Sequence, residues 1–190
     1  KASDIKLIIP EVKESGGIVP TSSTTAQLAL GDALAISSML YKKFGKLDFK
    51  KIHPAGNLGV QLKTVQDLML TGNKIPFINE NDKMKKALDL ITKKKLGVLI
   101  AKNSKGKTTG IITDGQIRRA SQNNKNIQNL SVKKVMTKNP ISVEKELLAA
   151  KALSIMNSKK ITSLCIHSGN KKNKTLGIIH IHNILEANIQ

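Results

Sequence analysis

The chain has 190 residues and a formal net charge of +19; 39% of its residues are hydrophobic and only 2% are aromatic. This length allows one medium domain or two to three small ones, with a core of aliphatic side chains. No apolar run approaches the roughly 20 residues that cross a bilayer, and no signal peptide is visible, so we expect no membrane span. The single cysteine, Cys165, predicts a reducing, cytoplasmic location.

The positive charge comes almost entirely from lysine, because only Arg118 and Arg119 are arginines. Arginine makes the bidentate contacts of nucleic-acid readers, and aromatic side chains supply their stacking platforms. Both are scarce here, so the charge predicts a lysine-rich solvated surface and no nucleic-acid partner. Small anionic ligands would still be attracted.

The first part of the chain, residues 1–62, combines one strand with one long helix. The apolar run "IKLIIP" predicts a strand over residues 5–10. The stretch "PTSSTTAQLALGDALAISSMLYKKFG" predicts a helix over residues 20–45, with hydroxyl side chains at its start and Gly45 at its end. One strand and one helix cannot close a core, so we expect the C-terminal part of a larger α/β domain. Because the chain begins with Lys1 rather than Met, it is expected to be a piece of a longer protein.

The rest of the chain contains an internal repeat with an offset of 67 residues. "VQDLM" at 65–69 matches "VKKVM" at 132–136, and "GII" at 110–112 matches "GII" at 177–179. Each repeat predicts the order β-α-β-β-α. The expected strands are 74–78, 96–101 and 109–113, then 139–143, 161–167 and 176–180; the helices between them are 83–95 and 146–160. The predicted domains are therefore residues 1–62, 63–128 and 129–190.

The two repeats resemble a tandem pair of CBS domains, through this element order and the junctions where "GII" enters a helix. In that superfamily the paired domains form clefts that often hold adenosine or other nucleotide ligands. The resemblance places Thr113 and Gln116, and then His180 and Asn183, at the ligand positions. Gln116 and Asn183 stand where the usual motif has an acid, and an amide can bind a ribose hydroxyl without adding charge. The alternative is a purely structural or dimer-forming pair.

Residues 4–62 resemble the end of the sugar-isomerase (SIS) domain of D-arabinose-5-phosphate isomerases, through "DIKLII", "PTSSTT", "LALGDALA" and "HPAGNLG". The implied fold class is α/β: the C-terminal part of a SIS-type sandwich followed by two βαββα CBS domains packed as a pair. The implied activity interconverts D-ribulose 5-phosphate and D-arabinose 5-phosphate, which feeds the synthesis of Kdo for lipopolysaccharide. The resemblance gives catalytic roles to His53 and Glu14. Ala55 stands where the family usually has glycine.

Aldose–ketose isomerisation moves a proton between C1 and C2 through an enediol, which requires acid–base groups and an anchored phosphate. Histidine titrates near neutral pH, so His53 fits such a step, with Glu14 as the second group. The hydroxyl-rich helix start at Ser22, Ser23 and Thr24 is a candidate for holding the substrate phosphate. No cofactor or metal is expected, since no metal-ligand spacing accompanies the histidines.

The expected partners are a sugar phosphate, a nucleotide or the sugar nucleotide CMP-Kdo in the CBS cleft, and further copies of the chain. By resemblance, CBS pairs form dimers and the whole protein a homotetramer. The alternative to an isomerase is a module that senses a nucleotide or CMP-Kdo without catalysis. The chain by itself is expected to be inactive, because the family's phosphate loop lies in the earlier half of the SIS domain.

Overall fold

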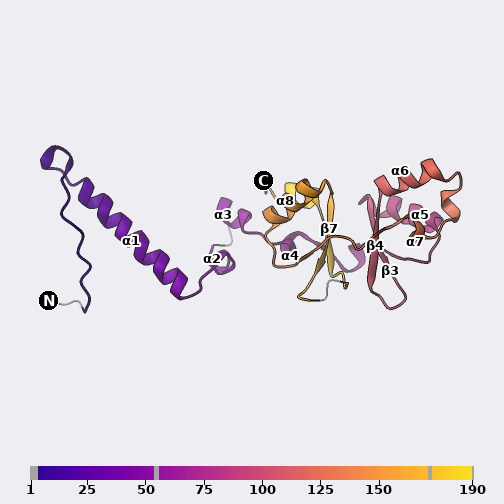
Figure 1. Ribbon diagram of the computed structural model, residues 1–190, viewed down its shortest axis with the longest axis horizontal. Helices are drawn as coiled ribbons and strands as arrows, with labels where there is room; N and C mark the ends of the chain where they lie inside the picture. The colour runs from indigo at the N-terminus through magenta and orange to yellow at the C-terminus, as the bar shows by residue number, and fades with distance from the viewer. Residues whose placement is uncertain (1–3, 54–55, 171–172, 190) are drawn as a thin grey trace. The chain divides into compact units, whose positions relative to one another are not determined.

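The computed structural model describes residues 4–53, 56–170 and 173–189 (Figure 1). Contacts divide the chain into an N-terminal region, residues 1–52, and a C-terminal region, residues 53–190. The C-terminal region holds every strand found in the described residues, and the N-terminal region is helical or extended.

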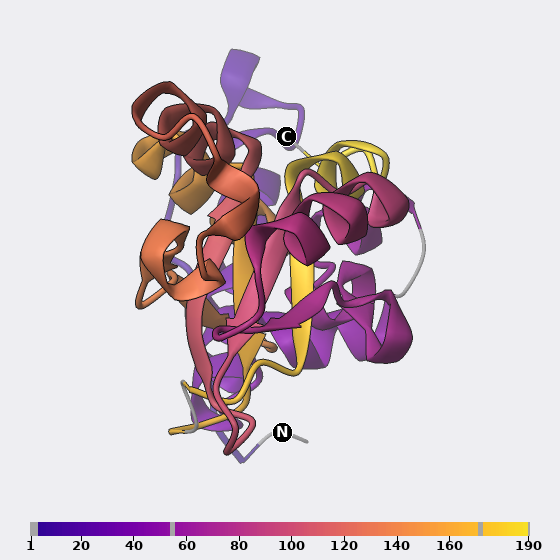
Figure 2. The ribbon, with the colours of Figure 1, turned by 90° about the vertical axis from the view of Figure 1, so that its right-hand side faces the viewer.

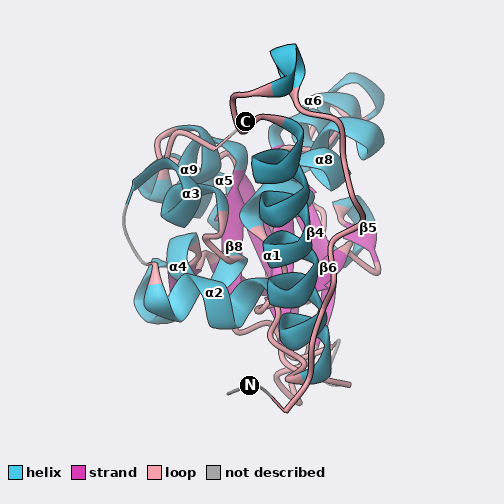
Figure 3. Cartoon of the chain, turned by 90° about the vertical axis from the view of Figure 1, so that its left-hand side faces the viewer, coloured by secondary structure: helices cyan, strands magenta, loops and turns pink. Residues whose placement is uncertain are grey.

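The N-terminal region consists of an extended segment, the short 3-10 helix η1 (Ser15–Gly17), and the helices α1 (Ser22–Tyr41) and α2 (Lys46–Ile52). Figure 3 shows α1 as one uninterrupted helix, and the chain before it as loop apart from the turn of η1. The strand expected over residues 5–10 is not formed, and Ile8 is 86% exposed. A strand needs a neighbour to bond its backbone groups, and none of the described residues provides one. The helix also ends earlier than Gly45, because Lys43 takes a left-handed φ of 52°.

The C-terminal region confirms the predicted α/β class and the repeated β-α-β-β-α order. Its helices are α3 (Gly56–Gln61), α4 (Val65–Leu68), α5 (Met84–Lys94), α6 (Asp114–Asn123), α7 (Val132–Val135), α8 (Ala149–Lys159) and α9 (Ile181–Leu185). The strands are β1 (Leu70–Thr71), β2 (Phe77–Asn79), β3 (Val98–Lys102), β4 (Thr108–Thr113), β5 (Thr137–Lys138), β6 (Ser142–Glu144), β7 (Ser163–His167) and β8 (Gly177–His180). Two short 3-10 helices, η2 (Gly72–Lys74) and η3 (Ile127–Asn129), complete it.

The strands form two four-stranded sheets, and each sheet contains one strand from the other repeat. The orders are β2-β3-β4-β5 and β1-β8-β7-β6. Strand β1 precedes the first repeat's own sheet but pairs antiparallel with β8, and β5 pairs antiparallel with β4. The β3–β4 turn and the β7–β8 turn lie at the same end of the region (Figure 2), where the Thr108 amide donates to the Asn173 carbonyl at 2.8 Å.

The short helices follow the same exchange. Helix α4 lies beside the strands of the second repeat and α7 beside those of the first (Figure 1). Val65 is fully buried in the core of the second repeat, with Ala152, Leu164 and Ile179. Val132 is fully buried in the core of the first repeat. These contacts explain why "VQDLM" and "VKKVM" carry apolar residues at matching positions.

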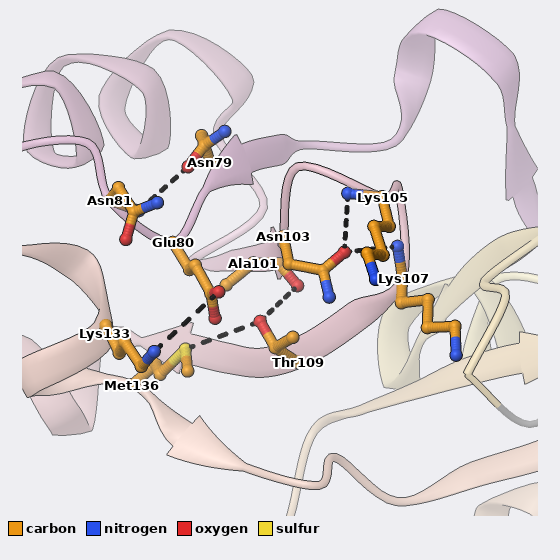
Figure 4. A network of polar contacts seen from close by, with 10 residues as sticks. All are labelled: Asn79, Glu80, Asn81, Ala101, Asn103, Lys105, Lys107, Thr109, Lys133 and Met136. Atoms are coloured by element: carbon orange, nitrogen blue, oxygen red, sulfur yellow. Dashed lines mark hydrogen bonds and ion pairs between the residues drawn. The ribbon is translucent and has the colours of Figure 1, made fainter.

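The segment at residues 133–136 is fastened to the first repeat by polar contacts as well (Figure 4). The Lys133 amide donates to the Glu80 carbonyl at 2.8 Å, and its Nζ lies 4.0 Å from Glu80 Oε1. The Thr109 hydroxyl lies 4.0 Å from the Met136 sulfur. A third apolar cluster joins residues of both repeats, Ile75, Val98 and Ile100 with Cys165 and Ile178. Both repeats therefore contribute residues to this third cluster.

Candidate functional site

The two repeats enclose a cleft of about 680 Å³. Its walls are the starts of α6 and α9 and the chain that leads into β3, β6 and β7. The lining residues are Leu96, Gly97, Ile111, Thr113, Asp114, Gly115, Gln116, Arg119, Thr137, Asn139, Pro140, Ile141, Lys160, Ile161, Thr162, Ser163, His180 and His182. Three of the four predicted ligand residues, Thr113, Gln116 and His180, thus line one cleft.

Thr113 and Gln116 form a capping box at the start of α6. The Gln116 Oε1 accepts hydrogen bonds from the Thr113 amide, at 2.9 Å, and from the Thr113 hydroxyl. The Gln116 Nε2 donates to the Thr137 hydroxyl on β5 at 2.8 Å. The amide at the place of the usual acid therefore ties the helix to the exchanged strand.

His180 and Asn183 repeat this arrangement at α9. The His180 amide donates to Asn183 Oδ1 at 3.1 Å, and His180 Nδ1 accepts from the His182 amide at 3.3 Å. Asn183 is not among the residues that line the cleft, so it supports His180 from behind. The His180 and His182 rings lie with centroids 4.9 Å apart. Burial, and then the charge of His182, lower the pKa of His180.

The cleft is rich in cationic and dipolar groups. Arg119 and Lys160 line it, and Asp114 is the one carboxylate among its lining residues. The α6 N-terminus adds a partial positive charge. Arg119 was not predicted, although it follows Gln116 by one helical turn, which is the signal that could have found it. Lys160 was also missed, because its place depends on the left-handed turn that ends α8.

Glu14 caps helix α1. Its Oε2 accepts from the amides of Thr21 and Ser22, at 2.6 and 2.9 Å, and its Oε1 accepts from the Ser23 amide at 3.2 Å. Hydrogen bonds from Ser23 and Thr21 lower the pKa of Glu14 to about 2. The carboxylate therefore occupies the helix N-terminus that a phosphate would otherwise favour.

The hydroxyls at the start of α1 bond within their own segment. Ser22 Oγ donates to the Lys13 carbonyl at 2.9 Å, and Thr24 Oγ1 donates to the Thr21 carbonyl at 2.7 Å. His53 follows α2 and is exposed, at the first residue of the C-terminal region. Pro54 and Ala55 lie outside the described residues.

In the part of the chain that the structure describes, no three or more His, Cys, Asp or Glu side chains are grouped so that they could hold a metal ion. In the same residues no helix combines the length and apolar character that a membrane crossing needs.

Comparisons with known proteins identify a domain family that matches this chain and relatives that are similar to it. The CBS domain family matches residues 65–123 and 132–189. The chain is 38% identical over 192 residues to the arabinose 5-phosphate isomerase KdsD of Salmonella typhimurium, a match that covers 100% of this chain and 58% of the relative. This confirms the resemblance seen in the sequence, and the chain spans little more than half of such relatives.

Solved structures agree with the fold of the C-terminal region. The structure of CBSX2 in complex with AMP matches with a TM-score of 0.58 and 19% identity, over 66% of this chain and 95% of that one. The CBS domain pair of protein MJ0100, in complex with 5′-methylthioadenosine and S-adenosyl-L-methionine, matches with a TM-score of 0.57 and 20% identity, over 66% and 94%. The family model matches two segments that together make up more than half of the chain, and each of these segments contributes a strand to the other's sheet. The chain therefore belongs to the CBS domain family.

Proposed function

We propose that the C-terminal region is the ligand-binding, regulatory part of an arabinose 5-phosphate isomerase. The observation that carries this proposal is the cleft of about 680 Å³ between the repeats, with Thr113, Arg119, Lys160 and His180 in its walls. A helix N-terminus, a guanidinium and an ammonium together favour a phosphate-bearing ligand. Solved CBS pairs with adenosine-type ligands support a nucleotide. CMP-Kdo is the second candidate, as the sugar nucleotide of the pathway that the sequence resemblance implies.

Isothermal calorimetry of residues 1–190 with AMP, ATP and CMP-Kdo tests this proposal. Binding of at least one compound is expected, weakened several-fold by Thr113→Val, which removes a hydroxyl from the cleft wall. Thr92→Val is the matched control, because Thr92 on α5 bonds only the Leu88 carbonyl, at 3.0 Å. Absence of heat with all three compounds would leave a purely structural pair and overturn the proposal.

We infer further that residues 4–62 contribute to the sugar-phosphate site of the isomerase. The support is the match to KdsD, which runs over the whole chain and so includes the part before the CBS segments. In this proposal His53 and Glu14 exchange protons with the substrate during formation and collapse of the enediol. Ser22, Ser23 and Thr24 hold the phosphate.

Glu14 must change partners for that role. A general base works best with a pKa near the working pH, whereas its capping bonds hold the pKa of Glu14 at about 2. A phosphate that took over the amides of Ser22 and Ser23 would release the carboxylate. Binding of the substrate phosphate at the start of α1 would then displace the Glu14 carboxylate and so activate it as a base.

The test of the catalytic role is His53→Ala in the full-length isomerase. We expect kcat/KM for ribulose 5-phosphate to fall by at least about 100-fold, the usual size of an acid–base contribution. Lys46→Ala on the exposed face of α2 is the control and is expected to keep activity. Wild-type turnover by His53→Ala would remove His53 from the mechanism. Residues 1–190 alone are expected to show no turnover.

We propose that the whole protein is a homotetramer, which CBS pairing and a SIS-type site favour. We also propose that it is cytoplasmic, which the single cysteine favours. Light scattering of the full-length protein tests the tetramer, and a dimer or monomer at micromolar concentration would contradict it.

A further inference from the structure

A second, smaller pocket continues the cleft along helix α6. It has a volume of about 350 Å³ and shares Gln116, Arg119 and Thr137 with the cleft. From there it extends over Ala120 and Asn123, which lie on the same helical face as Gln116 because they follow at one- and two-turn spacing. The far wall is Lys134, on the exchanged helix α7. We call this pocket the α6 groove.

The α6 groove is lined by cations without a carboxylate. Its charged lining residues are Arg119 and Lys134, and its other polar lining residues are amides and one hydroxyl, Thr137. Within the described ranges neither cation takes part in an ion pair, although neighbouring Lys133 lies 4.0 Å from Glu80. Two unneutralised cations about a shared pocket favour an anionic group between them.

The internal repeat shows that this charge is particular to the groove beside the first repeat's sheet. At the offset of 67 residues, Arg119 corresponds to Glu186 and Lys134 corresponds to Asp67. Asp67 accepts the Thr64 amide at 2.6 Å and caps α4. Both cations of the α6 groove are thus acids at the equivalent positions, Glu186 and Asp67, which lie beside the second repeat's sheet. A lysine-rich surface by itself predicts no such reversal at paired positions.

We propose that the α6 groove binds a second anionic group of the cleft ligand, either the end of a phosphate chain or the carboxylate of a nucleotide-linked sugar acid. Arg119 stands at the junction, where its planar guanidinium can hold the bridging phosphate in two parallel hydrogen bonds. Lys134 holds the far anion. Because the equivalent positions, Glu186 and Asp67, are acidic, one such ligand binds per chain. This inference rests on the proposed binding of a nucleotide in the cleft.

The test compares ligands that lack the second anionic group with ligands that carry it. Calorimetry of the full chain with AMP and ATP measures the effect of a phosphate chain, and CMP with CMP-Kdo measures that of a carboxylate-bearing sugar. In the wild type the longer member of at least one pair is expected to bind about tenfold more tightly or better. The pair that shows this gain identifies which source of the anion the groove takes.

Two variants test whether the tighter binding of the longer ligand depends on the α6 groove. Lys134→Gln is expected to reduce this gain in affinity by about three- to tenfold, as for an exposed charge-assisted contact, while binding of AMP and CMP changes less than twofold. Lys134→Asp, which installs the residue type of the equivalent position Asp67, is expected to abolish this gain in affinity. Glu186→Gln is the matched control and should leave it unchanged. Thermal unfolding of each variant checks the fold.

If Lys134→Gln changes the affinity for short and long ligands equally, or changes neither affinity, the proposed role of the α6 groove is wrong. The proposed binding of a nucleotide in the cleft would still stand. A change with Glu186→Gln as large as that with Lys134→Gln would also overturn the role of the α6 groove, because general electrostatics would then explain the gain. If none of the four nucleotides binds, the proposed function itself fails, and the inference fails with it.

Discussion

The side chain of Met69 lies against Gly177, which joins the start of the first repeat to the sheet of the second. A Cβ atom on Gly177 would stand 2.6 Å from the Met69 sulfur and 3.0 Å from the Leu70 carbonyl oxygen. Met136 lies against Gly110 in the same way, with the Thr137 carbonyl oxygen at 2.9 Å from the equivalent Cβ. The glycine of each "GII" is therefore needed for the close approach of the exchanged strand, and not for a special φ.

Gly177→Ala is expected to lower the free energy of unfolding of the C-terminal region by about 1–3 kcal/mol, the usual cost of overpacking. The Met69 side chain can rotate, but the Leu70 carbonyl belongs to the backbone of β1 and cannot move without breaking its pairing with β8. Urea denaturation measures the change. Gly115→Ala is the control, because its Cβ would meet nothing closer than 3.6 Å. Equal stability of both variants would contradict the packing argument.

Glu14 is expected to titrate far below an ordinary glutamate. Hydrogen bonds from Ser23 and Thr21 lower its pKa from 4.5 to about 2. The lowered pKa means that the cap stabilises α1 fully above about pH 4.5, and that this contribution is lost as the pH falls toward 2. Carbon-detected NMR of the side-chain carboxyl measures the midpoint. In Thr21→Ala the midpoint is expected to rise, and a midpoint near 4.5 in the unchanged chain would show that the cap is not formed.

His180 is expected to gain a proton less readily than a free histidine. Burial and the charge of His182 lower its pKa from 6.5. Because the neutral ring is favoured in the fold, His180 contributes its full stability above about pH 6.5, and that contribution declines as the pH falls below this value. His182→Gln removes a neighbouring charge and should raise the pKa of His180 in an NMR titration. An unchanged pKa would mean that burial alone acts, and a lower pKa would contradict the assigned effect of His182.

Cys165 is expected to react slowly in the folded protein. It is 1% exposed, and burial raises its pKa to about 11. The thiolate is the reactive form, so roughly one thiol in 1,000 is ionised at pH 8. Labelling with a thiol reagent at pH 8 should be at least about 100-fold slower in buffer than in denaturing urea. Since Cys165 is the sole cysteine of the sequence, no second thiol complicates the rate. Similar rates in both conditions would place it outside the core.

The spacing of apolar residues along the chain predicts individual helices and strands such as α5 and β3. Met84, Ala87 and Ile91 recur at helical spacing and are all buried on one face of α5, as the sequence predicted. Strand β3 is buried at four successive residues from Val98, which its continuous apolar run indicated. The expected strand at residues 5–10 failed for the opposite reason, because an apolar run does not specify a pairing partner.

The sequence by itself determined the repeat, the order of its elements and the residue types at the helix starts, since these depend on spacing and composition along the chain. Only the tertiary structure decided where these pieces pack. In the tertiary structure Val65 is buried in the core of the second repeat and Val132 in the core of the first. The tertiary structure also brings Gln116 within hydrogen-bond distance of Thr137, and it places Arg119 and Lys134 in the lining of one groove. The physical reason is that the exchange of β1 and β5 joins residues distant in the chain, and such contacts leave no periodic signal in the sequence.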